Sequence, residues 1–207
     1  MMRLIPLVIS LFLPLSLAAC NTDIGDIQQS EPVWFTMGNA DLPAARWDRQ
    51  PNGKLWTRSA IGELVSGAGR PLIKMVPKDI DAWCPAYAGQ DPYGRAAFWA
   101  GLLSAMAKHE STYNEQAVGG GGKWFGLVQI SPATARHYGC EVITGGDLKN
   151  GVKNLQCAIR IMAMTVPRDS VVAAGGKGVA ADWGPFHSAA KRAEMRGWVS
   201  SQAYCRR

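Results

Sequence analysis

The sequence has little of what several common catalytic and binding sites need. Its 207 residues include only three histidines and no G-x-S-x-G motif, so a serine hydrolase has little support. His109-Glu110 begins a zinc-protease motif, but Tyr113 stands where the second histidine is required. No Cys-x-x-Cys pair is present to favour zinc. We therefore expect no metal and no cofactor.

Other classes are excluded in the same way. Gly122-Lys123 resembles the end of a P-loop, but Ala117 and Trp124 occupy its first glycine and its Ser/Thr position, so the glycine run 119–122 is interpreted as a turn. The chain shows no internal repeats and little strand pattern. A hydrophobic fraction of 47% excludes wholesale disorder. The formal charge of +6 favours anionic partners, such as lipid headgroups, acidic polymers or nucleic acid.

The first twenty residues have the parts of an export signal. Arg3 is followed by an apolar run, which is short and broken by prolines, and then by small residues. The end of this segment, Leu17-Ala18-Ala19-Cys20, resembles the bacterial lipobox. The resemblance implies a signal peptide over residues 1–19 and a lipid on Cys20, and Asn21 implies sorting to the outer membrane. An ordinary signal cleaved near Ala19, or an uncleaved anchor, is the alternative.

Four cysteines remain after Cys20. An even number in an exported chain predicts two disulfides, with three pairings to choose from. We favour Cys140–Cys157, which closes a short loop, and Cys84–Cys205, which ties the end of the domain to its beginning.

The mature chain divides by pattern into three parts. Residues 20–33 are polar and aperiodic, which is typical of a tether. Residues 34–90, rich in Trp, Pro and Gly, predict a loop-rich extension with short helices near 58–66 and 77–83. Residues 91–207 predict a mainly α domain.

Cap signals place the helices of this domain. Asp91-Pro92 and Ser131-Pro132 each predict a helix start, the second helix reaching about Tyr138. Asp147 is expected to cap a helix that Pro167 stops, and the last helix is expected over about 188–204.

Glu110 is the strongest catalytic candidate. Phe98, Leu102 and Met106 form an apolar stripe at spacing four, and the next step of the stripe lands on Glu110. Burial and the negative end of the helix dipole both raise the pKa of such a carboxyl, which suits a general acid. The alternative is a helix-terminal carboxylate that turns into solvent.

The neighbours of Glu110 resemble the soluble lytic transglycosylase family, which is similar to goose-type lysozyme. The first motif is Ala107-Lys108-His109-Glu110-Ser111-Thr112-Tyr113-Asn114-Glu115-Gln116-Ala117-Val118, and the second is Gly126-Leu127-Val128-Gln129-Ile130-Ser131-Pro132-Ala133-Thr134-Ala135. Asn154 and Ala158 fit the family's next helix, and the resemblance covers roughly residues 92–200. It implies a lysozyme-like helical fold.

The resemblance also implies roles for single residues. Glu110 matches the catalytic acid/base, and Ser111 matches a residue whose hydroxyl fixes the substrate or the glutamate. Gly126 and Leu127 match a loop whose backbone approaches the sugar, and Gln129 matches a polar residue of the cleft wall, so the resemblance implies substrate binding for these residues. The third motif departs from the family, because Asp182-Trp183 precede Gly184-Pro185 where Tyr-Asn is usual. Trp183 is expected to stack on a sugar or to donate its indole N–H in place of the missing phenol. Asp182 is expected to be a salt-bridged surface residue or a second carboxylate.

The implied reaction is cleavage of the β-1,4 bond between N-acetylmuramic acid and N-acetylglucosamine in peptidoglycan, with a 1,6-anhydro product. Two alternatives remain open. One is a lysozyme-like hydrolase on the same fold, with Asp182, Glu115 or Asp147 as its second carboxylate. The other is a catalytically weak wall-binding lipoprotein that serves an envelope machine through an unidentified partner. The expected partners are glycan strands and, through Cys20, a membrane; export argues against nucleic acid.

Overall fold

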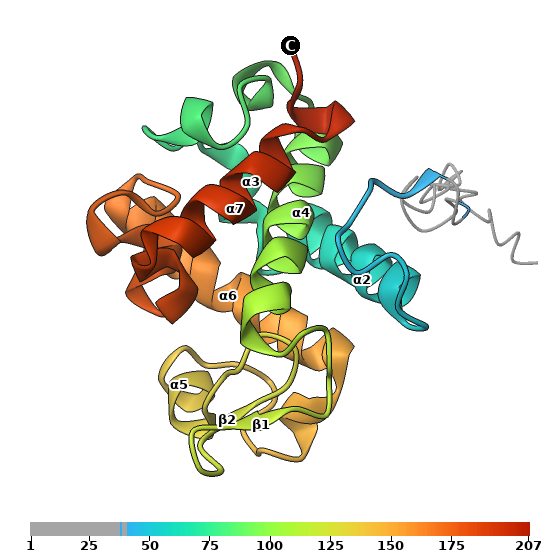
Figure 1. Cartoon of the computed structure of the whole chain (residues 1–207), viewed down its shortest axis with the longest axis vertical. Helices are drawn as coiled ribbons and strands as arrows, with labels where there is room; N and C mark the ends of the chain where they lie inside the picture. Colours follow the sequence, from blue (N-terminus) through green and yellow to red (C-terminus); the bar gives the residue numbers. More distant parts are fainter. Residues whose placement is uncertain (1–37, 39–40) are drawn as a thin grey trace, which may run out of the picture. The chain divides into compact units, whose positions relative to one another are not determined.

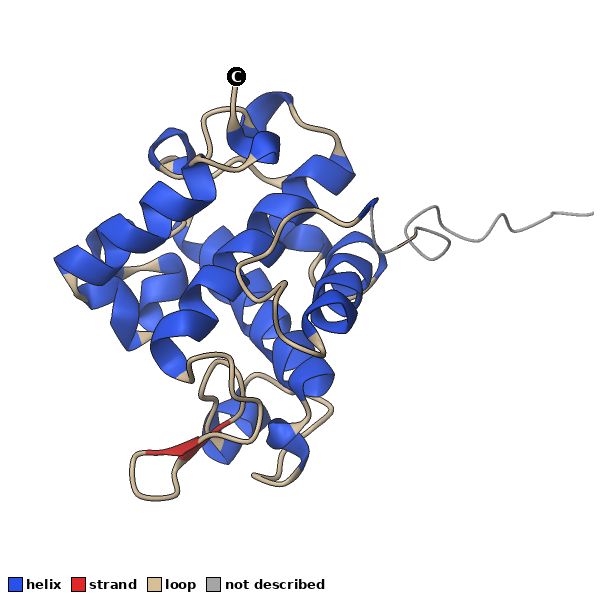
Figure 2. Ribbon diagram, turned by 45° about the vertical axis from the view of Figure 1, so that its right-hand side comes forward, coloured by secondary structure: helices blue, strands red, loops and turns tan. Residues whose placement is uncertain are grey.

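The computed structural model describes residue 38 and residues 41–207. The predicted signal peptide, Cys20 and the tether 20–33 lie outside the described residues. The described chain is mainly helical, with one two-stranded sheet, which confirms the expected fold class (Figure 2). No helix among the described residues is long and apolar enough to span a membrane.

Helix α4 (Pro92–Glu110) runs through the middle of the fold (Figure 1). It begins as predicted, because the Asp91 carboxylate accepts a 2.7 Å hydrogen bond from the Gly94 N–H. Its residues from Ala96 to Ala107 are all buried. The predicted apolar stripe is therefore one side of a helix that is buried on every side, packed against α2, α3 and α7.

Residues 41–90 are more helical than the predicted extension: the helix expected near 58–66 is present and begins earlier, at Gly53. Helix α2 (Gly53–Ser66) packs on α4 and on α6 (Gly151–Asp169), and a short α3 (Arg70–Lys74) follows it. Trp47 and Trp56 are buried in the same core as α4. Residues on both sides of the expected boundary at residue 91 therefore contribute to one hydrophobic core. The start of α2 has no side-chain cap, so the helix is stabilised by its tertiary packing. Such packing cannot be predicted from the local sequence. The helix expected over 77–83 is a 3₁₀ turn, Ile80–Ala82.

The later helices differ from the expected bounds at several ends. Ser131 caps α5 (Pro132–His137) as predicted. Helix α6 is capped by Asn150, not by Asp147, which accepts the Thr144 hydroxyl at 2.7 Å in the turn before it. It also continues past Pro167 to Asp169, since a proline so near a helix end removes only one backbone bond. Helix α7 (Ala189–Ser200) ends before the expected residue 204, and a 3₁₀ turn, Ala203–Cys205, follows.

Two disulfides hold this helical core together. They join Cys84 to Cys205 and Cys140 to Cys157, the pairing that the sequence analysis favours. The first links residues 121 positions apart and so fixes the end of the chain beside η3 (Tyr87–Gly89) and α4, whereas the second spans 17 positions and fixes the end of α5 to α6.

The glycine run 119–122 forms a turn, as predicted. It connects strands β1 (Val118–Gly119) and β2 (Trp124–Phe125), which pair antiparallel with Gly119 opposite Trp124. Gly120, Gly121 and Gly122 all have positive φ, which only glycine adopts readily in succession. The hairpin lies at the Glu110 end of α4 (Figure 1).

Candidate active site

A cleft of about 420 Å³ opens at the carboxyl end of α4. The hairpin, the 3₁₀ turn Gly184–His187 and the start of α7 enclose it. Its lining includes His109, Glu110, Gly120, Trp124, Gln129, Asp182, Trp183 and Lys191. Three segments far apart in sequence therefore meet around the carboxyl of Glu110.

Glu110 is the last residue of α4, so its side chain leaves the buried helix directly into the cleft. Partial burial raises the pKa of its carboxyl from 4.5 to about 7, and the charge of Lys191 opposes this rise. No described residue donates a hydrogen bond to the carboxyl. At neutral pH the group is thus divided between its acid and carboxylate forms, as acid/base chemistry requires.

The chain turns sharply after Glu110. Thr112 and Tyr113 have φ of 52° and 65°, an unusual left-handed pair for residues with side chains. Between them and Glu110, the Ser111 hydroxyl donates a 2.8 Å hydrogen bond to the Leu127 carbonyl. Ser111 therefore ties the end of α4 to the turn 126–130. It does not line the cleft, and this bond suits the second of the two roles implied by resemblance, fixing the glutamate rather than the substrate.

Asn154 organises the turn 126–130 from beneath. Its buried amide accepts from the Val128 N–H and donates to the carbonyls of Phe125 and Leu148, each at 3.0 Å. Gly126 has φ +81°, and a side chain there would overlap the Leu148 carbonyl and the Asn154 amide. Glycine is required here for packing against α6. Gly126 is not among the residues that line the cleft, and the expected approach of its backbone to a sugar stays a prediction.

The side chains of Leu127 and Gln129, which follow Gly126 in the turn, point in different directions: Leu127 into the core and Gln129 into the cleft. The Leu127 side chain is fully buried in the core, so any contact of this residue with a substrate is left to its backbone. Gln129 lines the cleft as expected, with a left-handed φ of 52°. Its amide nitrogen donates to the Gly126 carbonyl at 2.9 Å. The strained backbone is held by this bond, which turns the amide toward the hairpin.

Trp183 borders the cleft but is only 3% exposed. Its indole N–H donates a 2.8 Å hydrogen bond to the Val128 carbonyl. An indole has one donor, so Trp183 cannot also donate to Glu110 in place of the missing phenol. Nor does it present a free ring face for stacking. Both expected roles are wrong, and the residue instead fixes the wall of the cleft.

Of the three candidate second carboxylates, Asp182 alone lines the cleft. It accepts from the Tyr138 hydroxyl at 3.1 and 3.2 Å, and no ion pair joins it to another described residue, which corrects the expected salt bridge. Glu115 instead accepts from the Gly151 N–H, and Asp147 is engaged with Thr144. In the described part of the chain, no cluster of His, Cys, Asp and Glu could hold a metal ion.

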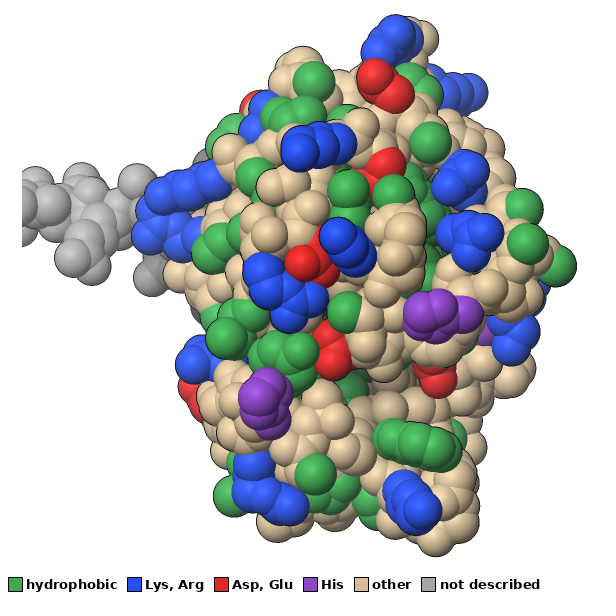
Figure 3. All heavy atoms as spheres, turned by 90° about the vertical axis from the view of Figure 1, so that its left-hand side faces the viewer, with side chains coloured by type: hydrophobic (Ala, Val, Ile, Leu, Met, Phe, Trp, Pro, Cys, Tyr) green, Lys and Arg blue, Asp and Glu red, His purple; other side chains and the backbone are tan. Residues whose placement is uncertain are grey.

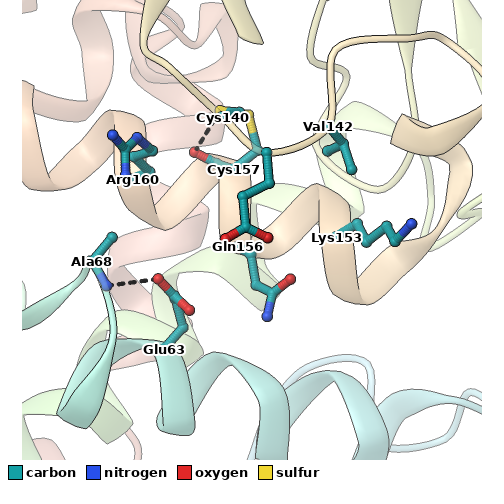
Figure 4. A pocket seen from close by; sticks show the side chains of 9 residues that line it. Glu63, Ala68, Cys140, Val142, Lys153, Gln156, Cys157 and Arg160 are labelled. Atoms are coloured by element: carbon teal, nitrogen blue, oxygen red, sulfur yellow. Dashed lines mark hydrogen bonds between the residues drawn. A yellow bond between two sulfur atoms is a disulfide. The ribbon is translucent and has the colours of Figure 1, made fainter.

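A smaller cavity of about 240 Å³ lies behind Tyr138, beside the disulfide Cys140–Cys157 (Figure 4). Arg160 lines this cavity and donates from Nε to the Tyr138 carbonyl at 2.9 Å. The disulfide and Arg160 together therefore hold the end of α5, from which the Tyr138 hydroxyl reaches Asp182 in the cleft.

Sequence reasoning missed three residues of the cleft. Trp124 is 46% exposed on the hairpin, where its ring lies against Gly120. Lys191 places a positive charge near Glu110, and the imidazole of His109 contacts Glu194 at 2.8 Å. A tryptophan beside a run of four glycines was a usable signal, because a Gly-rich turn leaves an aromatic ring uncovered. Lys191 gave no signal, since only the packing of α7 on α4 brings it near.

Comparison with known proteins agrees with this geometry. Residues 92–170, from the start of α4 to the end of α6, match the family model of the transglycosylase SLT domain. This stretch is therefore similar to a transglycosylase SLT domain. A search of curated protein sequences finds no match to it.

Solved structures of Bd0314 DslA share the fold of this chain. Two different Glu-to-Gln mutants of DslA are each 27% identical to it, with TM-scores of 0.72 and 0.71. They cover 79% and 78% of this chain, and 98% and 97% of their own. A wild-type form, 24% identical with a TM-score of 0.67, shows the same fold over 79% of this chain and 98% of its own. The likeness extends well beyond residues 92–170, so segments outside the family match share in the lytic transglycosylase-like fold.

Proposed function

We propose that this protein is a peptidoglycan lytic transglycosylase and that Glu110 is its single acid/base. The observation that carries the proposal is the position of Glu110, at the inner end of a buried helix, in a cleft, with a pKa of about 7. The SLT domain supports peptidoglycan as the substrate class. Basic side chains, which outnumber acidic ones on the face in Figure 3, suit an acidic wall polymer.

The proposed reaction uses the Glu110 carboxyl twice, first as an acid and then, as the carboxylate, as a base. Protonated Glu110 donates to the glycosidic oxygen as the bond from that oxygen to C1 of the muramoyl residue breaks. The muramoyl 6-hydroxyl oxygen then bonds to C1, and its proton returns to the Glu110 carboxylate. The products are an N-acetylglucosamine end with a free hydroxyl and a 1,6-anhydro-muramoyl end. Glu110 is regenerated in its acid form and no water is consumed, so a second carboxylate is not needed.

A hydrolase on the same fold is the second candidate, because Asp182 lines the same cleft. Water would then take the place of the 6-hydroxyl, with Asp182 as its base or as the nucleophile. Mass spectrometry of muropeptides released from purified sacculi separates the two reactions. Anhydro-muramoyl ends support the transglycosylase, and reducing ends support the hydrolase. Release of no muropeptide would reject both and leave a wall-binding protein.

We also propose that Cys20 carries a lipid that anchors the mature protein in the periplasm, at the outer membrane. The lipobox-like Leu17-Ala18-Ala19-Cys20 supports the anchor. The two disulfides support an oxidising compartment. The full-length protein and Cys20→Ala are compared by membrane fractionation. Wild type is expected in the outer-membrane fraction and the variant in the soluble fraction or unprocessed; equal soluble amounts of both would contradict the anchor.

A further inference from the structure

A cavity of about 380 Å³ lies on another part of the molecule, between the loop that follows α6 and one side of α7. Its lining is Asp79, residues 173–176, Arg192 and Arg196, and we call it the arginine pocket. It shares no lining residue with the cleft at Glu110. Residues 173–176 of the loop and the two arginines of α7 line the same cavity. The proposed reaction involves no residue of the arginine pocket.

The only carboxylate of the arginine pocket is already engaged. Asp79 accepts three backbone hydrogen bonds, from the N–H groups of Val172 at 2.5 Å and of Ala173 and Ala174 at 3.0 Å. These bonds hold the loop against the body of the protein. Asp79 makes no ion pair with either arginine.

The two guanidinium groups consequently have no anionic partner among the described residues. Arg192 donates to the Phe186 carbonyl at 2.5 Å, and Arg196 lies over the Trp83 ring, 5.0 Å from its centre. Nε of Arg196 is buried and has no hydrogen-bond acceptor. Two like charges four residues apart on one helix repel each other.

We propose that the arginine pocket binds an oxyanion, either a carboxylate or a phosphate group. Planar guanidinium groups suit both, because their paired N–H donors match two oxygen atoms. Gly175 and Gly176, with φ of 65° and 71°, line the pocket without contributing side chains. An oxyanion in the pocket accepts from the guanidinium N–H groups of Arg192 and Arg196 and relieves the repulsion between the two arginines. In the envelope, wall peptides supply carboxylates and lipid headgroups supply phosphates; this choice of sources rests on the proposed function and location.

The test measures binding to the folded mature protein by isothermal titration calorimetry. The probes are inorganic phosphate and acetyl-D-alanyl-D-alanine, a peptide with a free carboxylate. We expect at least one to bind, with affinity at least tenfold lower in Arg196→Gln and unchanged in Arg206→Gln, an exposed arginine outside the pocket lining. Arg196→Lys, which keeps the charge but not the fork, is expected to be intermediate. Binding of phosphate alone assigns a phosphate ligand, and binding of the peptide alone assigns a carboxylate.

The proposal would be overturned if both probes failed to bind at millimolar concentration. It would also be overturned if wild type and Arg196→Gln bound a probe with equal affinity. Thermal unfolding shows whether each variant is folded, and it gives a second readout, because the bound probe should raise the Tm of wild type but not that of Arg196→Gln. Glu110→Gln should bind the probe as wild type does. A failure of the proposed glycan chemistry therefore leaves this result standing, and the reverse is also true.

Discussion

The indole nitrogen of Trp183 donates a hydrogen bond of 2.8 Å to the carbonyl oxygen of Val128. This bond joins the segment before α7 to the turn 126–130, which Ser111 ties in turn to the end of α4. The three segments around Glu110 are thus linked by two bonds from side chain to backbone. At the third motif, where Tyr is usual in the family that the sequence resembles, Trp183 therefore does not contact Glu110 but stabilises the turn beside it.

Replacing Trp183 by Phe should lower both stability and activity. The buried Val128 carbonyl would lose its partner, at a cost of about 1–3 kcal/mol in the free energy of unfolding. Activity should fall more than tenfold because the turn shifts. Trp47→Phe is the matched control, since its buried indole donates to Thr57 away from the cleft. It should cost similar stability in urea unfolding and retain activity; equal loss of activity in both variants would contradict the bracing role.

The pH dependence of cleavage should follow Glu110. Its pKa of about 7 means that the acid form, which begins the reaction, is lost above that pH. Rates should therefore fall about tenfold per pH unit on the alkaline side. Because the charge of Lys191 lowers the Glu110 pKa, Lys191→Gln should move this limb to higher pH. Lys123→Gln, on the exposed turn, should leave the profile unchanged, and an unshifted limb in Lys191→Gln would refute the assignment.

Trp124→Ala should weaken substrate binding without unfolding the protein. The ring is 46% exposed on the hairpin, so its removal costs little core packing. An aromatic face over the cleft suits stacking on a sugar, and we expect KM to rise about tenfold, equivalent to about 1.4 kcal/mol. Val118→Ala removes an equally exposed side chain, 48%, from the other strand. Steady-state kinetics on a soluble glycan should separate them, and an unchanged KM in Trp124→Ala would exclude stacking.

The two disulfides should differ in what they support. Removing Cys84–Cys205 with paired serines opens a link across 121 positions and should cost about 4–5 kcal/mol. Removing Cys140–Cys157, across 17 positions, should cost about 3 kcal/mol. The second loss should nevertheless reduce activity more, because it frees the end of α5 that carries Tyr138. Urea unfolding measures the loss of stability in each variant, and sacculus digestion at the same temperature measures the loss of activity. The account is contradicted if the Cys140–Cys157 variant loses more stability, or if the Cys84–Cys205 variant loses more activity.

Local chemistry explains what the sequence could predict. Asp91 and Ser131 cap their helices as expected because an N-cap bond lies within four residues of chain. The spacing from Met106 placed Glu110 at the end of a buried helix, since helical periodicity is also local. Disulfide pairing followed from loop length and chain order.

Tertiary contacts decided the rest. Helix α2 has no cap, and only its packing on α4 and α6 shows that residues 41–90 belong to the core. Leu127 and Gly126 occupy motif positions but serve packing, whereas Gln129 alone of that turn turns into the cleft because its φ is left-handed. Lys191 comes near Glu110 from 81 positions away through the packing of α7 on α4, a distance that no pattern in the sequence spans.

The central claim is that the Glu110 carboxyl moves the proton. Its most direct test is the release of soluble muropeptides from sacculi by Glu110→Gln, beside Glu141→Gln, the same substitution at an exposed glutamate. We predict that Glu110→Gln loses at least a thousandfold in rate while remaining folded, and that Glu141→Gln releases anhydro-muropeptides as wild type does. Release by folded Glu110→Gln at a rate near that of wild type would contradict the account.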